Sequence, residues 1–254
     1  MKYSHIFITR PQHEAEELAA RLSPLGLPCL VQPAFRYEPL DAREQQPGDF
    51  AELEHAAGEP LLIFTSPRAV EHGLPQLEPA LLKRAALAAI GPATASALAA
   101  SGQRVGITPR GGYTSEALLE TLSGDAGESA AIRRSVFILA APGGRMRLLE
   151  GIEQLGWDCR MIMVYRSLPA ELDRAVLEAL ENATEVLSVW TSANAMQGLS
   201  QRLPSAAWYR ICQGDWLVIS ERLRRLARAY GPARIHLAAG PGNEDLASAV
   251  RRLF

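Results

Sequence analysis

An internal repeat constrains the fold of this 254-residue chain more than any single motif does. Three segments of the chain recur further along, at offsets of 130, 126 and 129 residues. They are residues 5–40 and 135–170, residues 61–77 and 187–203, and residues 87–122 and 216–253. A repeat of this length means that one series of elements is used twice, so the two halves are predicted to share an architecture.

Each repeated segment consists of a short apolar run, a turn and an amphipathic stretch. Leu61–Phe64 is apolar at every position, as a strand of a parallel sheet must be when helices cover both of its faces. Glycines such as Gly26 and Gly156 follow the amphipathic stretches, where helices commonly end. Strands that alternate with helices in this way predict an α/β fold with open, doubly wound parallel sheets.

The length of the chain favours two domains of about half its size. Polar, strand-like stretches at residues 35–39 and 165–169 are the natural places for the chain to pass between them. The repeat alone leaves two arrangements open: two contiguous domains, or a swapped one in which residues 1–35 pack with the C-terminal half. The acidic segment 41–54, which contains Pro47 and Gly48, is predicted to be a surface connection.

The composition disfavours several classes of partner. A net charge of -2 gives no reason to expect binding to nucleic acid or to an anionic membrane. There is no run of about 20 apolar residues, and the first residues lead straight into a predicted strand, so a cytoplasmic location is expected. Cys29, Cys159 and Cys212 lack the spacing of a disulfide framework, and no two histidines have the helical spacing of a zinc site. We therefore predict no metal.

Ligands of open parallel sheets bind at the carboxyl ends of the strands, where loops lead into helix N-termini with free N–H groups. The pattern gives eight such loops, at residues 9–11, 65–67, 91–94, 114–116, 141–145, 191–194, 220–222 and 240–244. Their serines, threonines and prolines are also ordinary helix-capping residues, so each loop alone has a structural explanation. Together they predict a cleft between two domains, suited to a ligand with many carboxylates or phosphates.

The common cofactor motifs are missing from the sequence. Gly143 and Gly144 follow a predicted strand, but without the G-x-G-x-x-G spacing of dinucleotide binding, and no P-loop or G-x-S-x-G elbow occurs. A nicotinamide or flavin cofactor is therefore not expected. Tyr165 lies on one predicted interdomain connection, opposite Phe35 in the repeat. It is either a packing aromatic or a neutral proton donor that faces the cleft.

Six short motifs, in their order and spacing, resemble those of the uroporphyrinogen-III synthase family. They are residues 8–11 (ITRP), 64–70 (FTSPRAV), 90–95 (IGPATA), 164–166 (VYR), 190–192 (WTS) and 218–222 (VISER). The ordered series runs through the whole chain, and its order carries the resemblance, since no single motif is specific.

The resemblance implies two flavodoxin-like domains in the swapped arrangement, joined by a two-stranded linker near residues 35–39 and 165–169. Residues 1–36 with 168–254 form one domain in this arrangement, and residues 37–167 form the other. It also implies a lyase of haem biosynthesis that closes the linear tetrapyrrole hydroxymethylbilane to uroporphyrinogen III, with loss of water and inversion of ring D. Such an enzyme needs no cofactor or metal, and we expect it to be a monomer.

Tyr165 matches the family's recurring tyrosine, which is placed to assist departure of the substrate hydroxyl. The loops supply the candidate substrate-binding residues, which are Thr9, Arg10, Pro11, Ser66, Thr94, Ser115, Gly143, Gly144, Arg145, Thr191, Ser192 and Ser220. The second copy departs from the family's glycine-to-threonine loop, since residues 220–222 (SER) stand where the first copy has residues 91–94 (GPAT). A role for Glu221 or Arg222 therefore does not follow from the resemblance.

A function of another class also fits these patterns. A non-catalytic two-domain sensor that closes on an anionic metabolite has the same sheets and cleft, because a fold does not fix a function. The porphyrin isomer formed from hydroxymethylbilane distinguishes the two hypotheses.

Overall fold

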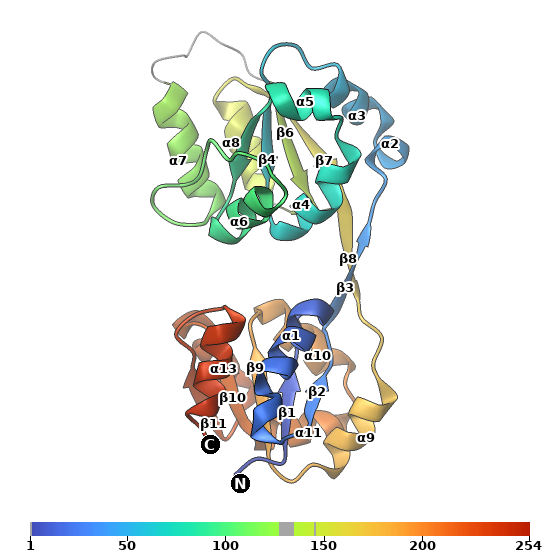
Figure 1. Cartoon of the computed structure of the whole chain (residues 1–254), viewed down its shortest axis with the longest axis vertical. Helices are drawn as coiled ribbons and strands as arrows, with labels where there is room; N and C mark the ends of the chain where they lie inside the picture. Colours follow the sequence, from blue (N-terminus) through green and yellow to red (C-terminus); the bar gives the residue numbers. More distant parts are fainter. Residues whose placement is uncertain (1, 127–134, 145) are drawn as a thin grey trace. The chain divides into compact units, whose positions relative to one another are not determined.

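The computed structural model describes residues 2–126, 135–144 and 146–254 (Figure 1). The chain forms two compact units. Unit 1 consists of Met1–Arg36 and Leu168–Phe254, and unit 2 consists of Tyr37–Ser167. The chain passes between the units along β3 (Phe35–Pro39) and β8 (Tyr165–Pro169), which pair with each other as a two-stranded sheet.

Unit 1 is built on a five-stranded sheet in which every pairing is parallel. Its strands are β1 (His5–Ile8), β2 (Cys29–Val31), β9 (Val186–Trp190), β10 (Asp215–Val218) and β11 (Arg234–Leu237), in the order β11-β10-β9-β1-β2. Numbered along the chain within the unit, this is the order 2-1-3-4-5 of flavodoxin-like sheets. The predicted α/β class with open parallel sheets is confirmed.

Helices cover both faces of this sheet because the strands are apolar on both. Ile6 and Ile8 point to the face covered by α1 (Gln12–Leu22) and α13 (Asn243–Arg251), whereas Phe7 points to the other face. The helices on that second face are α9 (Arg174–Asn182), α10 (Ala193–Arg202), α11 (Ser205–Gln213) and α12 (Glu221–Ala227). Short 3-10 turns, η1 (Ser23–Leu25) and η3 (Arg228–Tyr230), end α1 and α12.

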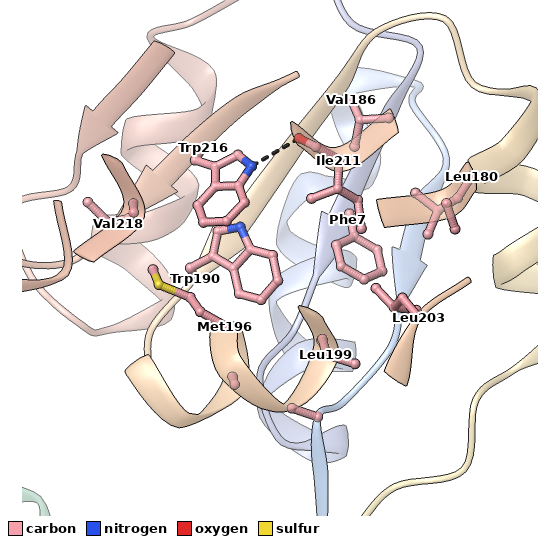
Figure 2. Packing of buried hydrophobic residues seen from close by; sticks show 14 of the residues in the cluster. Phe7, Leu180, Val186, Trp190, Met196, Leu199, Leu203, Ile211, Trp216 and Val218 are labelled. Atoms are coloured by element: carbon pink, nitrogen blue, oxygen red, sulfur yellow. Dashed lines mark hydrogen bonds between the residues drawn. The ribbon is translucent and has the colours of Figure 1, made fainter. Parts of the chain in front are cut away.

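Tryptophan rings fill the larger of the two cores in unit 1 (Figure 2). The rings of Trp190 and Trp216 lie 4.8 Å apart between centroids, and both side chains are fully buried. The indole N–H of Trp216 donates to the carbonyl of Ile211 at 2.9 Å. This bond ties the end of α11 to β10 and satisfies a polar group that would otherwise be buried without a partner.

Unit 2 has a four-stranded parallel sheet, in the order β5-β4-β6-β7. Its strands are β4 (Leu61–Phe64), β5 (Ala86–Ala89), β6 (Ser135–Ala140) and β7 (Asp158–Met163). A parallel bridge from Ala88 to Ile107 extends the sheet beyond β5. The strands β5, β4, β6 and β7 therefore lie in the same order as β10, β9, β1 and β2 of unit 1. The chain enters the sheet of unit 1 at β1, but it enters the sheet of unit 2 at β4, which corresponds to β9, the third strand of unit 1.

Alternating residues of β4 again face two separate cores. Leu62 and Phe64 face α4 (Pro67–Gly73), α5 (Pro79–Arg84) and α6 (Pro92–Ala100), and η2 (Leu74–Gln76) follows α4. Leu61 and Ile63 face α7 (Ser115–Ala126) and α8 (Met146–Gln154) on the opposite side. The prediction that Leu61–Phe64 is a strand buried on both faces is confirmed.

The prediction of a surface connection at residues 41–54 is wrong. This segment forms α2 (Ala42–Gln45) and α3 (Pro47–Glu54), which cover the same face of the sheet as α4. Ala42, Phe50 and Leu53 are buried there, with Phe50 and Leu53 one helical turn apart. Pro47 starts α3 instead of interrupting it, since a proline fits the first helical turn.

Of the helices in the described residues, none has the length and apolar composition needed to cross a membrane.

A cluster of polar side chains fastens the first residues of the chain to the start of β10. The carboxylate of Asp215 accepts hydrogen bonds from Lys2 Nζ and the Tyr3 hydroxyl, both at 2.6 Å, and lies 3.0 Å from His236 Nε2. Burial alone would raise the pKa of Asp215, but the hydrogen bonds outweigh it and hold the pKa at about 2. The ionised carboxylate is therefore favoured by the fold.

Asp215→Asn should lower the free energy of unfolding by about 2 kcal/mol at pH 7. Because the folded pKa lies below the ordinary value of 3.8, the stabilisation is present above about pH 4 and is lost as the pH falls towards 2. The difference between variant and parent should therefore shrink below pH 4. Urea unfolding at several pH values, monitored by tryptophan fluorescence, measures this difference in the free energy of unfolding.

Glu178→Gln is the matched control in unit 1, since Glu178 forms an exposed pair with Arg174 that should contribute less than about 0.5 kcal/mol. A loss in Asp215→Asn no larger than in this control would contradict the stabilising role of the cluster.

Candidate active site

The candidate residues of each unit follow the strands at which the direction of winding reverses. In unit 1, β1 leads into α1 on one face and β9 leads into α10 on the other. In unit 2, β6 and β4 lead into α8 and α4 in the same way. Ligands of open α/β sheets bind at this point, outside the carboxyl ends of the two strands, because the diverging loops leave a crevice there.

Six of the sequence-predicted residues lie along this edge of the sheet in unit 1. Thr9, Arg10 and Pro11 follow β1, Thr191 and Ser192 follow β9, and Ser220 lies just after β10. Five others lie along the corresponding edge in unit 2, namely Ser66 after β4, Thr94 after β5, Ser115 at the start of α7, and Gly143 and Gly144 after β6. Tyr165 begins β8, two residues after β7 ends. Arg145 lies outside the described residues.

A threonine hydroxyl joins the two central strands in each unit. Thr9 Oγ1 donates to the carbonyl of Val189 at 2.8 Å, which links β1 to β9. Thr65 Oγ1 donates to the carbonyl of Leu139 at 2.9 Å, which links β4 to β6. Both side chains are buried. Their protons are therefore used within the sheet, so neither hydroxyl has a proton left to donate to a carboxylate of a ligand.

Arg10 is the most enclosed cation at the edge of unit 1. Its Nη1 donates to the carbonyl of Pro241 at 2.6 Å, so the side chain lies against the loop before α13. Burial lowers the pKa of Arg10, although Glu14 and Glu17 act in the opposite direction. Its Nε atom is buried and has no hydrogen-bond partner within the described residues. The guanidinium has five N–H donors, so beyond the bond to Pro241 it keeps terminal N–H groups that can bind a carboxylate.

Serine side chains cap three of the helices that begin at these edges. The hydroxyl oxygens of Ser66, Ser192 and Ser220 accept from the backbone N–H groups of Ala69, Ala195 and Leu223, at 3.1, 3.4 and 3.2 Å. Each cap satisfies one of the N–H groups that a helix start leaves free. The capping explanation given by the sequence is therefore correct for all three, and it leaves the serine hydroxyl protons available for a second partner.

Residues of unit 2 pack around Tyr165. Its hydroxyl lies 3.0 Å from Ser66 Oγ, at the start of α4. Its ring meets Tyr37 edge to face, with centroids 6.0 Å apart, and the His72 ring, with centroids 5.8 Å apart. The side chain is 9% exposed. The ring of Tyr165 thus packs against other aromatic rings, and its hydroxyl lies at the start of a helix. The two sequence interpretations, a packing aromatic and a proton donor, are therefore not exclusive.

Apart from Ser66, the sequence analysis did not identify the side chains around Tyr165 as candidate residues. Arg68 places its guanidinium over the Tyr37 ring, 5.1 Å from the centroid, and pairs with Glu71 at 2.6 Å. Arg68 and His72 are four residues apart and share one side of α4, a spacing that was visible in the sequence. What the sequence could not show is that β3 and β8 bring Tyr37 and Tyr165 to the same helix.

The remaining candidates in unit 2 differ in their exposure. Thr94 and Ser115 are buried at the starts of α6 and α7. Gly143 is exposed and adopts a left-handed backbone, with φ of 72°, that a residue with a side chain rarely adopts. A Cβ added to Gly144 would lie 3.1 Å from the carbonyl of Ala141. The turn after β6 therefore has little room for a side chain at Gly144.

Within residues 2–126, 135–144 and 146–254, no group of three or more His, Cys, Asp or Glu side chains is placed to hold a metal ion. All three cysteines are free. Burial raises the pKa of Cys159 to about 12 and that of Cys212 to about 11, so neither thiol is a reactive thiolate near neutral pH.

Comparison with known proteins identifies the family of this chain. A family model described as "Uroporphyrinogen-III synthase HemD" matches residues 16–248. The uroporphyrinogen-III synthase of Escherichia coli (strain K12) is 32% identical over 257 residues, which cover 97% of this chain and 99% of that protein.

Two crystal structures show the fold at lower identity. A mutant uroporphyrinogen III synthase from the extremely thermophilic bacterium Thermus thermophilus superposes with a TM-score of 0.60 at 18% identity, covering 98% of both chains. Uroporphyrinogen-III synthetase from Helicobacter pylori 26695 gives the same TM-score and identity, covering 98% of this chain and 99% of that one.

Thr65→Val should lower the free energy of unfolding by about 1 kcal/mol, because the substitution keeps the shape of the side chain and removes its bond to Leu139. Thr191 occupies the same place in the second copy of the Thr-Ser motif, and its hydroxyl bonds to none of the described residues. Thr191→Val is therefore the matched control and should change stability less. Urea unfolding followed by circular dichroism tests the pair, and equal losses would contradict the role of the threonine bond.

Proposed function

The chain belongs to the uroporphyrinogen-III synthase family and has the activity of that family, and from this premise we propose how its residues carry out the reaction. The substrate is the linear tetrapyrrole hydroxymethylbilane, and the product is uroporphyrinogen III. The observation that carries the proposal is the hydroxyl of Tyr165, held at the start of α4 beside the strand ends of unit 2.

We propose that Tyr165 is the proton donor for the first step. Its O–H gives a proton to the terminal hydroxyl of the substrate as the carbon–oxygen bond breaks, which releases water and leaves a protonated azafulvene cation and the tyrosine oxyanion. The azafulvene carbon then forms a bond to the substituted carbon of ring D, giving a spiro intermediate that rearranges with ring D inverted. The closed macrocycle regains its aromatic pyrrole by losing one proton, so the proton taken from Tyr165 can be replaced and the overall change is loss of water.

The remaining candidate residues are proposed to hold the acetate and propionate groups of the substrate. Arg10 offers a charged donor, and the hydroxyls of Thr191, Ser192 and Ser220 lie on the same edge of unit 1. The helix starts after Gly144 and around Thr94 and Ser115 offer main-chain N–H groups. Among its hydrogen-bond donors Thr9 can offer a carboxylate only its main-chain N–H, since its hydroxyl proton is used on the carbonyl of Val189, and Pro11 has no N–H and can only shape the turn. Gly143 and Arg145 complete this set, whereas the hydroxyl of the remaining candidate, Ser66, lies against Tyr165.

Binding of this kind supports catalysis by positioning. Hydroxymethylbilane closes without an enzyme to the uninverted isomer, so the protein has to favour one folded conformer of the substrate. Holding reacting groups in the correct geometry can supply several kcal/mol of the barrier reduction without a protein nucleophile. The binding-only alternative, a sensor for an anionic metabolite, requires none of this chemistry. Incubation with enzymatically generated hydroxymethylbilane and analysis of the porphyrin isomers decides between them.

Tyr165→Phe should lower kcat by about 10²–10⁴-fold, the usual contribution of general acid assistance, because it removes the proton donor. The residual enzymatic product should still be isomer III, since the ring that packs against Tyr37 and His72 is kept. Turnover and isomer ratio are read from one chromatogram. Turnover equal to that of the parent would show that Tyr165 is a packing residue only.

Gly144→Leu should instead change the isomer ratio, with isomer I increasing relative to isomer III. The added side chain starts 3.1 Å from the carbonyl of Ala141, so the turn must shift and the N–H groups of the α8 start are displaced. Substrate that is no longer held in the productive conformation then closes without the enzyme's control, which gives isomer I. The same chromatogram tests this, with circular dichroism to show that the variant is folded. An unchanged isomer ratio in a folded variant would remove this turn from the binding site.

A further inference from the structure

Beyond the role of Tyr165 itself, we infer that Ser66 is a positioning residue, whose hydroxyl donates to the Tyr165 oxygen and thereby directs the Tyr165 proton away from α4. The inference rests on the proposed function of Tyr165. It assigns Ser66 a role through the tyrosine, in addition to the capping of α4 that the sequence already explains.

Counting donors and acceptors leaves two possible directions for the bond between the two hydroxyls. A serine hydroxyl has one proton to donate and two lone pairs. Ser66 Oγ already uses a lone pair to accept from the N–H of Ala69 at 3.1 Å. If Tyr165 donated to Ser66, the tyrosine proton would be consumed within the protein. If Ser66 donates, the tyrosine oxygen accepts and its own proton points elsewhere.

The electrostatics of the helix start favour donation by Ser66. The first turn of a helix carries a partial positive charge on its free N–H groups, so an oxygen is attracted to it and a hydroxyl proton is repelled. The Ser66 oxygen therefore faces the N–H of Ala69, and its proton points away from α4, towards the Tyr165 oxygen 3.0 Å away. Accepting a bond from Ala69 also polarises the serine O–H and makes it a better donor.

Packing fixes the ring of Tyr165, so the main motion left to the side chain is rotation of its O–H bond. Tyr37 and His72 contact the ring from two directions, and the side chain is 9% exposed. The Nε2 atom of His72 is buried and has no hydrogen-bond partner within the described residues, so this ring packs against Tyr165 without bonding its hydroxyl. Ser66 is thus the group that orients the proton.

The other serine caps show that this arrangement is particular to Ser66. Ser192 and Ser220 accept from Ala195 and Leu223 in the same manner, yet neither hydroxyl bonds to a tyrosine in the part of the chain that the structure describes. Capping alone therefore does not produce the contact with Tyr165.

Three substitutions separate donation from capping. Ser66→Thr keeps both functions, Ser66→Gly removes the hydroxyl at a cap position where glycine costs little, and Ser66→Asp keeps a capping acceptor but has no proton to donate at neutral pH. We expect kcat within about 2-fold of the parent for Ser66→Thr and about 10-fold lower for the other two, the equivalent of one hydrogen bond. KM should change less than kcat.

Asp173→Gly is the matched control for loss of a cap, since Asp173 caps α9 through the N–H groups of Ala175 and Val176 and belongs to no proposed site. Its melting temperature is compared with that of Ser66→Gly, and its kcat should equal that of the parent. In a Tyr165→Phe background, Ser66→Gly should change kcat by less than about 2-fold, because no proton remains to be oriented.

Two results would overturn the inference. One is a kcat for Ser66→Asp or Ser66→Gly equal to that of Ser66→Thr. The other is a loss in Ser66→Gly that is as large in the Tyr165→Phe background as in the parent, which would mean that Ser66 acts directly on the substrate. Failure of the proposed function looks different, since it appears as parental turnover in Tyr165→Phe alone.

Discussion

The hydrogen-bonded pairing of two parallel strands at the centre of each sheet is the interaction on which the rest of this protein depends. Because the helices that follow β1 and β9 leave towards opposite faces, the loops at that edge diverge and expose helix starts. Thr9 in unit 1 and Thr65 in unit 2 each add a side-chain bond between the central strands at that point. Without this pairing, neither the helix starts nor the residues they carry would share an edge.

Burial of both sheet faces explains why the polar chemistry is confined to strand ends. Every residue of β4 and of β9 is buried, so a polar side chain in the middle of such a strand loses its contact with water, which is costly. Ser188 in β9 is the example, since its hydroxyl is buried and has no hydrogen-bond partner within the described residues. At the carboxyl ends, Ser66, Ser192 and Ser220 satisfy helix N–H groups and remain half-buried. At the amino end of β10, Asp215 is buried but has three partners, and it serves stability.

The sequence predicted what periodicity determines and missed what depends on contacts between distant segments. The strand at Leu61–Phe64 follows from its continuous apolar run, and the capping residues follow from their place before helices. The prediction of a surface connection at residues 41–54 failed because acidic residues, Pro47 and Gly48 outweighed the buried pair Phe50 and Leu53. The contacts of Tyr165 with Tyr37, Ser66 and His72 join segments up to 128 residues apart, which no local pattern reveals.

The repeat also shows how a duplicated scaffold can carry one chemical group. Phe35 and Tyr165 correspond at the offset of 130 residues, as Gly198 and His72 do at the offset of 126. Phe35 packs on α10 beside Gly198, where a Cβ would lie 3.2 Å from its ring, and Tyr165 packs on α4 beside His72. Both units therefore place an aromatic ring against corresponding helices, α10 after β9 in unit 1 and α4 after β4 in unit 2. Only the ring in unit 2 carries a hydroxyl, and Ser66 is the cap that it meets, so the chemistry belongs to one unit while the packing belongs to both.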